Sequence, residues 1–539
     1  MKVNSFATGK AATMNNVNEA KGQMCNTSRN HLMVDRCKLV NAIVVFCMAV
    51  YFFVIPGFII LKEVSMPDIK KPGVPAIAWK MHRDVSQKFA RWARDRVASG
   101  NAGHLQLGDV PSTEWPMFGC VFYLMATENL QNEWEKNNRL APVAPRVYAR
   151  EAIDAAIDLV MDPVHHTWVK QHWGPSYLHR ENVFFRSLLI RAITSHEKIT
   201  ENGKYLDVLR DQSVSLADEL DKSKFGILDD YPSECYPIDV LASIAWIKSS
   251  GEMLGIDNRK FVERSVRAFH GKMLDERGLP PFVMDSWTGT FLSTDFGEKY
   301  RCSRGTGNSW VLIFVRELWP DIAERWYVAY EKYFWQDKWW ANGFREFPNN
   351  MLGLNYAYDV DSGPIIAGFS PAANAFGVAM ARANGRFDHA YILTAQVLAS
   401  CWPLLDGTML GARILSNQAH APYLGESAIC YFLTQQPIAG AKVVTGGRMP
   451  LFVFILVMFY YWGIGVALIW STVSSMSTWN KNKATAVIPV ERLQVLMWIM
   501  LYLTGLIVLC TGHIGAGILI GLFAQFLPRC RMAKCVDEK

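Results

Sequence analysis

The sequence predicts an all-α protein in which an (α/α)6 toroid lies between membrane-spanning helices, one near the N-terminus and two or three near the C-terminus. Three observations lead to this prediction. Three apolar blocks frame the chain, at 39–61, 449–470 and 493–527. About twelve segments between them have helical periodicity, with no run of alternating strands. The connections between these segments alternate between short and long, as in a ring of antiparallel helices.

The first apolar block, residues 39–61, is long enough to cross a bilayer, which takes about 20 apolar residues. It follows a basic tail, residues 1–38, whose cations are Lys2, Lys10, Lys21, Arg29, Arg36 and Lys38. A cleavable signal peptide would be shorter and would end in small residues, so we expect an uncleaved anchor. Because basic flanks stay in the cytoplasm, the tail is expected inside and the following domain outside.

The second block, residues 449–470, is expected to return the chain to the cytoplasm. The loop that follows it is basic, with Lys481, Lys483 and Arg492. The third block, residues 493–527, is too long for one ordinary span, and a glycine-rich segment at 511–517 interrupts it. The last segment, 528–539, is basic again, and an inside tail requires two crossings. We therefore expect a hairpin and four spans, against the alternative of one long tilted helix.

Composition restricts where the protein acts and what it binds. Half of its 539 residues are hydrophobic, and the apolar blocks account for much of the mean hydropathy of +0.07. The net charge is only +6 and lies mostly outside the central domain, so no nucleic-acid partner is expected. We expect a multi-pass protein of a bacterial inner membrane, with the domain 65–445 on the periplasmic, extracytoplasmic side. Its expected partners are the lipid bilayer and a small-molecule or glycan substrate, and a homo-oligomer is an open option.

The helices of the domain follow a proline-rich linker at 66–75. The expected helices are 81–98, 114–137, 144–160, 181–198, 203–223, 239–254, 258–274, 307–317, 319–335, 370–383, 385–400 and 424–434. One face of a helix is marked by Leu209, Ser213, Leu216 and Leu220.

The connections between these helices alternate in length. The short ones are 138–143, 199–202, 255–257, 318 and 384. The long ones are 99–113, 161–180, 224–238, 275–306, 336–369 and 401–423. In a ring of antiparallel helices, alternate connections lie at opposite ends, so the long ones should gather at one mouth. Loops that carry function cluster on a rigid scaffold in this way.

These long connections hold most of the informative polar residues. Segment 226–239 supplies Asp229, Asp230, Tyr231, Glu234, Tyr236 and Asp239. Later connections add Asp285, Trp287, Asp295, Glu298, Tyr300, Arg304, Arg345, Glu346, Tyr358, Asp359, Asp361, His420, Tyr423 and Glu426. Carboxylates crowded in an aromatic cavity push their pKa values apart, so that one stays protonated and another ionised.

We therefore predict an acid–base site among these loops. The expected catalytic residues are Asp230, Asp239, Asp229 and Asp361. The expected substrate-binding residues are Tyr231, Glu234, Tyr236, Arg304, Asp359, Glu426 and Trp287. The alternative for any single acid is loop solvation or helix capping, which would suffice for Asp239.

Patterns for metal or cysteine chemistry are incomplete, so no metal and no cofactor is expected. Asp359 and Asp361 lack the further oxygen ligands of a calcium loop. The histidines His165, His166, His172 and His179 match no zinc template. Cys235 has no paired base in the sequence, and the five scattered cysteines of the domain do not suggest a disulfide framework. Trp310 and Trp326 are expected in the core.

An ordered series of motifs resembles the linalool dehydratase/isomerase family. The motifs are SRGTGNSW at 303–310, WPDIAERWY at 319–327, DVDSG at 359–363 and GRFD at 385–388. The resemblance covers roughly 180–430 and leaves out the membrane-spanning ends. It implies an (α/α)6 toroid and an enzyme that hydrates, dehydrates and isomerises monoterpene alcohols without a cofactor, using cysteines with acid–base partners.

The chain departs from this family at the important positions. The resemblance places the paired cysteines of the family enzyme near Asp229 and Asp230 and on Asp239, so carboxylates replace thiols. The active-site histidine of the family corresponds to Ser187. The resemblance therefore carries over the fold and not the linalool activity.

Three functions are compatible with this sequence. The first is a membrane-anchored lyase or isomerase acting on a lipophilic, isoprenoid-like alcohol. The second is a glycoside hydrolase of the (α/α)6 type that cleaves an envelope polysaccharide, with Asp239 and either Asp230 or Asp361 as its acid/base pair. The third is a non-catalytic binding protein of the envelope. A closed apolar pocket would favour the first, and an open tryptophan-lined groove the second.

Overall fold

The computed structural model describes residues 40–481 except 294–295, 298–299, 352–353, 405, 407 and 412–419, together with 500–501, 503–505 and 520–521. The described chain is mostly helical, as the sequence predicts. It divides into two compact units, one comprising residues 59–456 and the other the residues before and after them.

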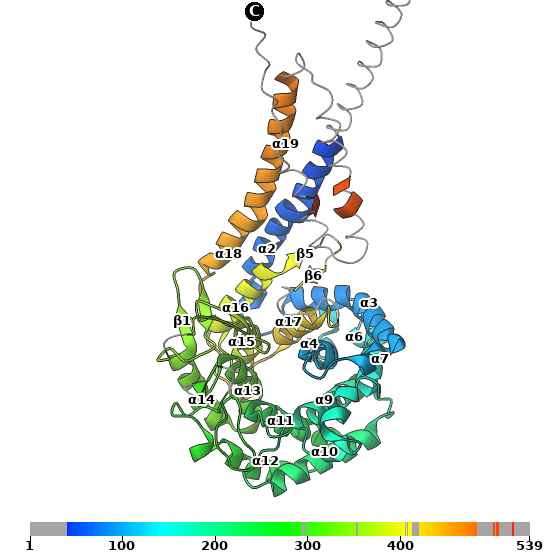
Figure 1. Ribbon diagram of the computed structural model, residues 1–539, viewed down its shortest axis with the longest axis vertical. Coiled ribbons are helices and arrows are strands. Elements are labelled where there is room, and N and C mark those ends of the chain that lie inside the picture. Colours follow the sequence, from blue (N-terminus) through cyan, green and yellow to red (C-terminus); the bar gives the residue numbers. More distant parts are fainter. Residues whose placement is uncertain are drawn as a thin grey trace, which may run out of the picture. The chain divides into compact units, whose positions relative to one another are not determined.

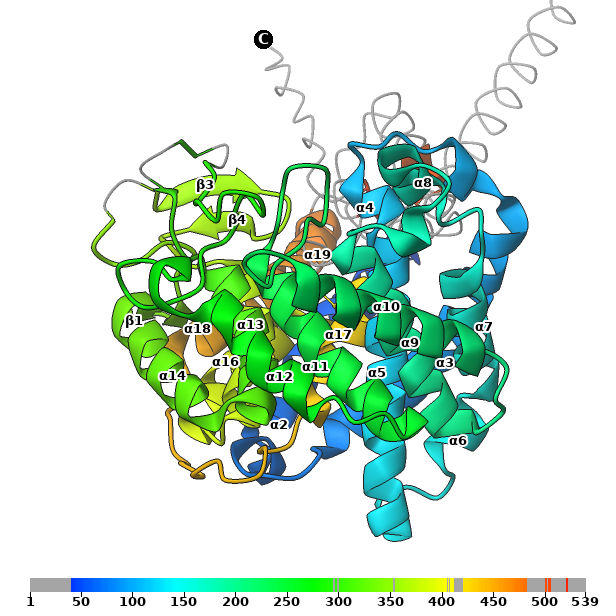
Figure 2. The ribbon, with the colours of Figure 1, turned by 90° about the horizontal axis from the view of Figure 1, so that it is seen from below.

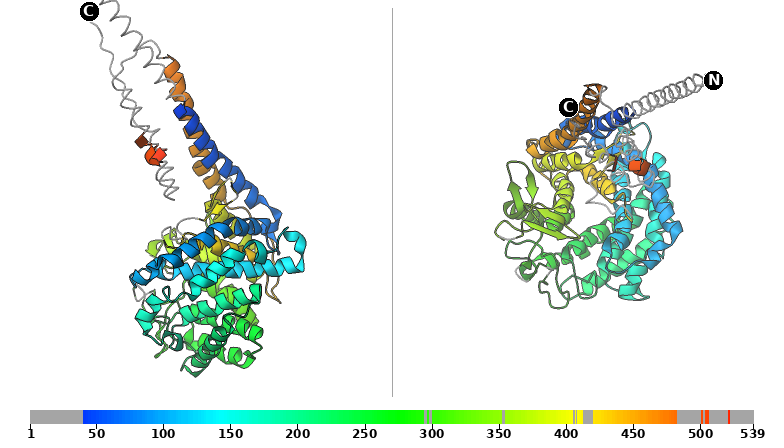
Figure 3. Two further views of the ribbon diagram at one scale, coloured as in Figure 1. Left: turned by 90° about the vertical axis from the view of Figure 1, so that its right-hand side faces the viewer. Right: turned by 45° about the horizontal axis from the view of Figure 1, so that its top comes forward.

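Six helices of the 59–456 unit form a closed ring. They are α5 (Trp115–Lys136), α9 (Val183–Thr200), α11 (Pro237–Leu254), α13 (Gly305–Leu318), α15 (Pro371–Ala383) and α17 (Leu424–Thr434). Each contacts the next in this order, and α17 contacts α5. The ring is seen in Figure 1 and in the right view of Figure 3.

Six further helices pack on the outside of this ring. They are α3 (Ala76–Ser99), α7 (Arg150–Met161), α10 (Leu206–Lys222), α12 (Arg259–Ser265), α14 (Pro320–Phe334) and α16 (Phe387–Ser400). Each contacts at least one inner helix: α3 contacts α17, α7 contacts α5, α10 and α12 contact α11, α14 contacts α13, and α16 contacts α15. Inner and outer helices therefore alternate along the chain. Figure 2 shows the same helices from below.

Local sequence fixes where these helices begin and end. Helix α11 starts with Pro237 at its first position and ends at Gly255, whose φ of +70° is readily adopted by glycine. Helix α15 starts where the Ser370 side chain accepts a hydrogen bond from the backbone of Ala373, with Pro371 at the first position. These boundaries place the starts of inner helices at the ends of long connections.

Each of the twelve predicted helical segments contains a helix, but three features differ from the prediction. The segment 258–274 is α-helical only to Ser265 and continues as the 3-10 turns Val266–Phe269 and Gly271–Met273. The connection 161–180 contains a short helix, α8 (Thr167–Trp173). Further short helices are α4 (Val110–Thr113) and α6 (Pro145–Tyr148), with 3-10 turns at Pro67–Lys70, Asn101–His104, Asn138–Leu140 and Tyr177–His179.

Three short antiparallel hairpins also occur in the long connections. They pair β1 (Trp335–Asp337) with β2 (Asn342–Phe344), β3 (Tyr356–Asp359) with β4 (Gly363–Ile366), and β5 (Trp402–Pro403) with β6 (Met409–Leu410). Strands of two to four residues are too short for an alternating pattern to be recognised in sequence. The β3–β4 register pairs Asp359 with Gly363, so the turn between them presents residues 360–362.

Two helices are long and apolar enough to cross a membrane, Val40–Ser65 and Leu451–Trp470. They coincide with the first two predicted apolar blocks. They include π-helical segments at Val50–Val54 and Leu456–Gly463, followed by α2 (Ile55–Ser65) and α19 (Ile464–Lys481), while Leu451–Ile455 is α18. In the smaller unit, Trp462 Nε1 donates to the carbonyl of Val54 at 3.2 Å. Most of the third block, 493–527, lies outside the described residues, so the hairpin stays a prediction.

Candidate active site

A cavity of about 460 Å³ lies within the 59–456 unit. Its apolar wall comes from the inner helices α5, α9, α13, α15 and α17, mainly through Phe118, Phe122, Phe184, Trp310, Phe376, Ile429 and Phe432. Five carboxyl groups also line it, those of Glu114, Asp230, Glu234, Asp239 and Asp361. The cavity is therefore an aromatic chamber that contains a group of acids.

The long connections meet at this cavity. Counting described residues alone, five of the six contribute to the lining: 99–113, 161–180, 224–238, 275–306 and 336–369. None of the predicted short connections does so. The alternation of connection lengths in the sequence therefore indicates correctly where the loops gather.

Asp230 is fixed by the backbone of two elements. Its Oδ1 accepts the N–H of Phe184 at 2.8 Å, and its Oδ2 accepts the N–H of Tyr236 at 2.7 Å. Burial, and then the negative charge of Asp239, raises the pKa of Asp230 well above its ordinary value, although the two N–H donors oppose this shift. Two backbone N–H groups therefore hold the Asp230 carboxyl in place, in surroundings that favour its neutral form.

Asp239 lies in the first turn of α11, at the end of the loop that carries Asp230. Burial, and then the charge of Asp361, raises the pKa of Asp239 to about 8. The indole N–H of Trp310 hydrogen-bonds to its carboxyl group and limits this rise. Trp310 itself packs edge-on against Phe118 and Phe122. Its assignment to the core is therefore incomplete: it is buried, and it also lines the cavity and holds a carboxyl group.

Asp361 lies at the tip of the β3–β4 hairpin, and Asp359 shapes that tip. The Oδ1 atom of Asp359 accepts the N–H of Asp361 at 3.0 Å and the N–H of Ser362 at 3.1 Å. Asp361 lines the cavity and is also exposed to solvent, and the protein atoms packed around its carboxyl group raise its pKa to about 6. The charge of Asp359 adds to the rise, whereas Arg304 opposes it.

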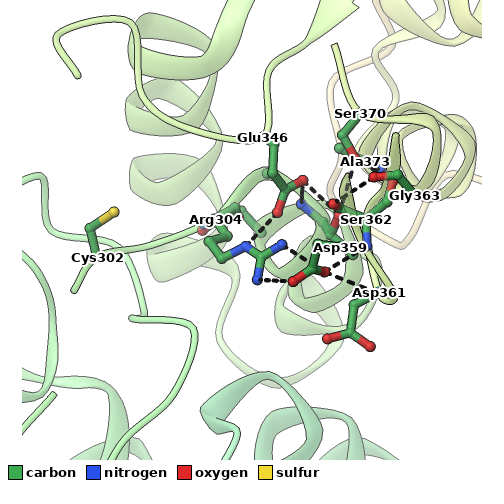
Figure 4. A network of polar contacts seen from close by, with 12 residues as sticks. Cys302, Arg304, Glu346, Asp359, Asp361, Ser362, Gly363, Ser370 and Ala373 are labelled. Atoms are coloured by element: carbon green, nitrogen blue, oxygen red, sulfur yellow. Dashed lines mark hydrogen bonds and ion pairs between the residues drawn. The ribbon is translucent and has the colours of Figure 1, made fainter. Parts of the chain in front are cut away.

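A buried network anchors this turn (Figure 4). Arg304 donates to Glu346 at 2.6 Å and pairs with Asp359 at 3.0 Å. The hydroxyl of Thr306 donates to Glu346 at 2.7 Å, and the hydroxyl of Ser370 donates to the carbonyl of Ser362 at 3.1 Å. The Asp361 carboxyl points away from the network in Figure 4. Arg304 and Asp359 therefore hold the hairpin and do not line the cavity themselves.

Glu114 is a cavity acid that the sequence reasoning missed. It lies between α4 and α5, is 8% exposed, and accepts a hydrogen bond from the hydroxyl of Tyr231. Burial, and then the charges of Asp361 and Asp239, raises its pKa well above the ordinary value. The Tyr231 ring packs beside Trp168 and edge-on to His172, whose own pKa is lowered by burial.

Tyr236 and Glu234 line the same cavity as the acids. The hydroxyl of Tyr236 donates to Glu234 at 3.3 Å, and its ring packs edge-on against Phe282. Together with Tyr231, three of the residues that the sequence predicts to bind substrate thus line the cavity.

Other predicted residues lie away from the cavity lining. Trp287 is 75% exposed on a loop. Asp229 accepts the backbone N–H of Ser233 at 2.8 Å, and Glu426 accepts that of Gly411 at 2.9 Å, so both brace loops. The candidates Asp295 and Glu298 lie outside the described residues.

Thiol and metal chemistry have no geometric support among the described residues. Burial raises the pKa of Cys235 well above its ordinary value, and the side chain is fully buried. The hydroxyl of Ser187 donates to the carbonyl of Phe184. Within the described ranges, no three His, Cys, Asp or Glu side chains are placed to share a metal ion. Of the histidines at 165–179, only His172 lines the cavity.

Comparisons with known proteins leave the activity open. No family model and no curated sequence matches the chain. Among solved structures, the chain is similar to D-mannose isomerase, with 10% identity and a TM-score of 0.37 over 64% of this chain and 98% of that one. It is also similar to the Lin0763 protein from Listeria innocua, with 10% identity and a TM-score of 0.33 over 64% and 96% of the two chains. Likenesses of this degree carry no argument about function.

Proposed function

We propose that the protein is an acid–base enzyme, a lyase or isomerase that acts on a lipophilic, isoprenoid-like alcohol. The observation that carries this proposal is the aromatic cavity, in which one carboxyl group is protonated and another is ionised at neutral pH. The pKa of Asp239 is about 8 and that of Asp361 about 6. An apolar substrate would bury its hydrocarbon part against the phenylalanine wall and present its hydroxyl to the acids.

The roles follow from these protonation states. Asp239 donates its proton to the substrate hydroxyl, and the C–O bond breaks with its electron pair leaving on water. The positive charge that develops on carbon faces the aromatic rings and the negative charge of Asp361. Asp361 then removes a proton from the neighbouring carbon, whose C–H electrons form the new C=C bond. Tyr231, Tyr236 and Glu234 orient the substrate.

We also propose the finer features of architecture and location. The closed ring with its outer helices is assigned as an (α/α)6 toroid that resembles the linalool dehydratase/isomerase fold. The chain is assigned as a multi-pass membrane protein with this domain outside the cytoplasm. Two apolar helices support this location, because a lipophilic substrate partitions into the bilayer to which the domain is attached.

Glycoside hydrolysis is the second candidate, because a protonated and an ionised carboxyl group are also what that reaction uses. Two observations disfavour it. Among the residues that the structure describes, two tryptophans, Trp115 and Trp310, line the cavity, and phenylalanines and aliphatic residues make up most of the remaining wall. Sugars would leave many hydroxyl groups unpaired against such a wall.

The test is a paired substrate screen of the purified full chain in detergent. Wild-type protein, Asp239→Asn and Asp361→Asn are incubated with isoprenoid alcohols and, separately, with envelope glycans, and the products are read by mass spectrometry. We expect wild-type protein alone to convert an alcohol, either by loss of water or by migration of its hydroxyl group. Cleavage of a glycan that both variants abolish would replace the proposal with the second candidate. A substrate conversion that survives both substitutions would show that the acids are not the site.

A further inference from the structure

The acids of the cavity lie at one end of it, where the inner helices begin. Asp239 is in the first turn of α11, and Glu114 directly precedes α5. Asp230, Glu234 and Asp361 belong to the long connections. Among the described residues, no acid that lines the cavity lies deeper than a first turn. An alcohol that meets these acids therefore has its hydroxyl at the mouth and its hydrocarbon chain further inside.

The cavity reaches deepest along α17. On α9 and α11 its described lining residues stop within the first turn, whereas on α17 they continue through Leu424, Ala428 and Phe432. These three positions are four residues apart, so they follow one another down a single face of the helix. Phe432 lies eight residues beyond Leu424, or about 12 Å along the helix axis. The cavity is therefore a pocket that runs towards the C-terminal end of α17.

Three aromatic rings from three inner helices close the deep end. The ring centroid of Phe432 lies 5.5 Å from that of Phe122 and 5.4 Å from that of Phe376, edge-on to both. The rings of Phe122 and Phe376 lie 6.4 Å apart. Phe122 and Phe432 are almost fully buried. The pocket therefore ends in packed protein at these rings and not in solvent.

A second, smaller apolar space lies directly behind Phe432. Its other walls include Val378 of α15, Leu398 of α16 and Leu433 of α17. Ile429 and Phe432 line both this space and the main cavity, so they form the partition between the two. Removal of the Phe432 ring would join the smaller space to the cavity.

We infer that Phe432 sets the longest hydrocarbon chain that the site accepts; this inference rests on the proposed function. A chain whose hydroxyl meets the acids runs along α17 and stops at the Phe432 ring. An extended chain advances roughly 1.3 Å per carbon atom. A depth of about 12 Å therefore holds about nine carbon atoms. A longer chain has to fold back, or its hydroxyl stays short of the acids.

The test measures binding alone, so it does not depend on catalysis. Saturated primary alcohols of eight to fourteen carbons are titrated calorimetrically into the purified full chain in detergent. These alcohols form no stabilised cation, so they bind without conversion. At each chain length, the dissociation constant of a variant is divided by that of wild type. This ratio cancels the partition of the alcohol into detergent micelles.

The ratio for Phe432→Ala should fall as the alcohol becomes longer. Up to about nine carbons, the variant should bind within about threefold of wild type, because the chain does not reach the partition. At twelve carbons and beyond, it should bind at least about tenfold more tightly, since each methylene that enters the joined space contributes about fourfold. Phe432→Leu keeps part of the partition and should show the same trend with a smaller effect. It supplies the test if Phe432→Ala does not fold.

Phe185→Ala is the matched control. It removes the same ring from the inner helix α9, where Phe185 is fully buried and packs against His166, Trp168 and Tyr177. Its ratio should stay constant across the series.

Two results would overturn the inference. A ratio for Phe432→Ala that stays constant with chain length would mean that another part of the wall limits the chain. The same trend in Phe185→Ala would mean that general loosening of the ring admits longer chains. Both results leave the proposed function standing, because alcohols still bind. Wild-type protein that binds none of the alcohols would contradict the proposed function, and this inference with it.

Discussion

Replacing Asp239 with asparagine is expected to remove a pH-dependent loss of stability. Burial, and then the charge of Asp361, raises the pKa of Asp239 in the folded protein to about 8, whereas an unfolded chain has an aspartate pKa of about 3.9. Between these values the unfolded chain has released a proton that the folded protein retains. The unfolded state then binds fewer protons, so the free energy of unfolding falls as pH rises.

The magnitude follows from one proton. Its release changes the free energy of unfolding by about 1.4 kcal/mol per pH unit, or roughly 2.7 kcal/mol between pH 5 and pH 7. This slope does not depend on the exact pKa of folded Asp239 while that pKa stays above 7. With an unfolding entropy of about 2 cal/mol/K per residue over residues 59–456, 1 kcal/mol corresponds to about 1 °C in Tm. Between pH 5 and pH 7, the Tm of wild type should therefore fall by about 3 °C more than the Tm of Asp239→Asn.

The assay is thermal unfolding of both proteins in the same detergent at pH 5, 6 and 7. Because Asp239 is neutral in the folded protein over this range, the neutral amide leaves its neighbours in the same electrostatic field. Asp285→Asn is the matched control, since hydrogen bonds from Thr288 and Trp287 lower the pKa of Asp285 and its stabilising effect is complete above pH 5. A Tm difference between Asp239→Asn and wild type that stays constant from pH 5 to pH 7 would refute the reasoning.

Three further outcomes are expected. Activity should follow a bell-shaped pH profile with limbs near 6 and 8, because Asp361 must be ionised and Asp239 protonated; Asp361→Asn should be inactive across the range. Arg304→Lys keeps the charge but loses the planar contacts to the hairpin, so kcat should fall by about tenfold or more, and thermal unfolding should show a loss of roughly 2 kcal/mol. Ala375→Phe fills part of the cavity and should raise KM by at least about tenfold in steady-state assays, with little change in Tm.

Helical periodicity located eleven of the main helices because each has eleven or more residues and buries an apolar face, whereas the seven-residue α12 was located only as the start of a longer predicted segment. The elements it did not locate are short. Helix α8 has seven residues and the strands have two to four, so neither repeats often enough to form a pattern. The predicted helix at 258–274 ends at Ser265, and the chain is extended at His270 before Gly271 adopts a φ of +58°. Single-residue breaks of this kind are weak signals beside the apolar spacing.

The sequence predicts part of the candidate site because several of its acids lie on long connections. Asp230, Asp239 and Asp361 were found for this reason. Glu114 was not, because an acid at the start of an expected helix is indistinguishable from a favourable charge at a helix N-terminus. Trp310 was assigned to the core because an inner helix is apolar towards both its neighbours and the cavity, so periodicity cannot separate packing from lining.

The sequence does not distinguish residues that hold a loop in place from residues that line the cavity. Asp359 and Asp361 are two positions apart, yet one closes a turn and pairs with Arg304 while the other faces the cavity. Asp229 and Asp230 are adjacent and differ in the same way. The distinction depends on loop backbone geometry, which no spacing rule encodes. The exposed Trp287 shows the converse, since an aromatic residue on a long connection need not face the mouth.

Conversion of isoprenoid alcohols in deuterated water tests the central claim most directly. Wild-type protein in detergent should remove the hydroxyl group of at least one such alcohol or move it to another carbon. Product that re-enters the reaction should carry deuterium on carbon. Asp239→Asn and Asp361→Asn should each abolish both changes. Absence of any mass change in the alcohols, together with wild-type cleavage of an envelope glycan that the same two variants abolish, would contradict the account.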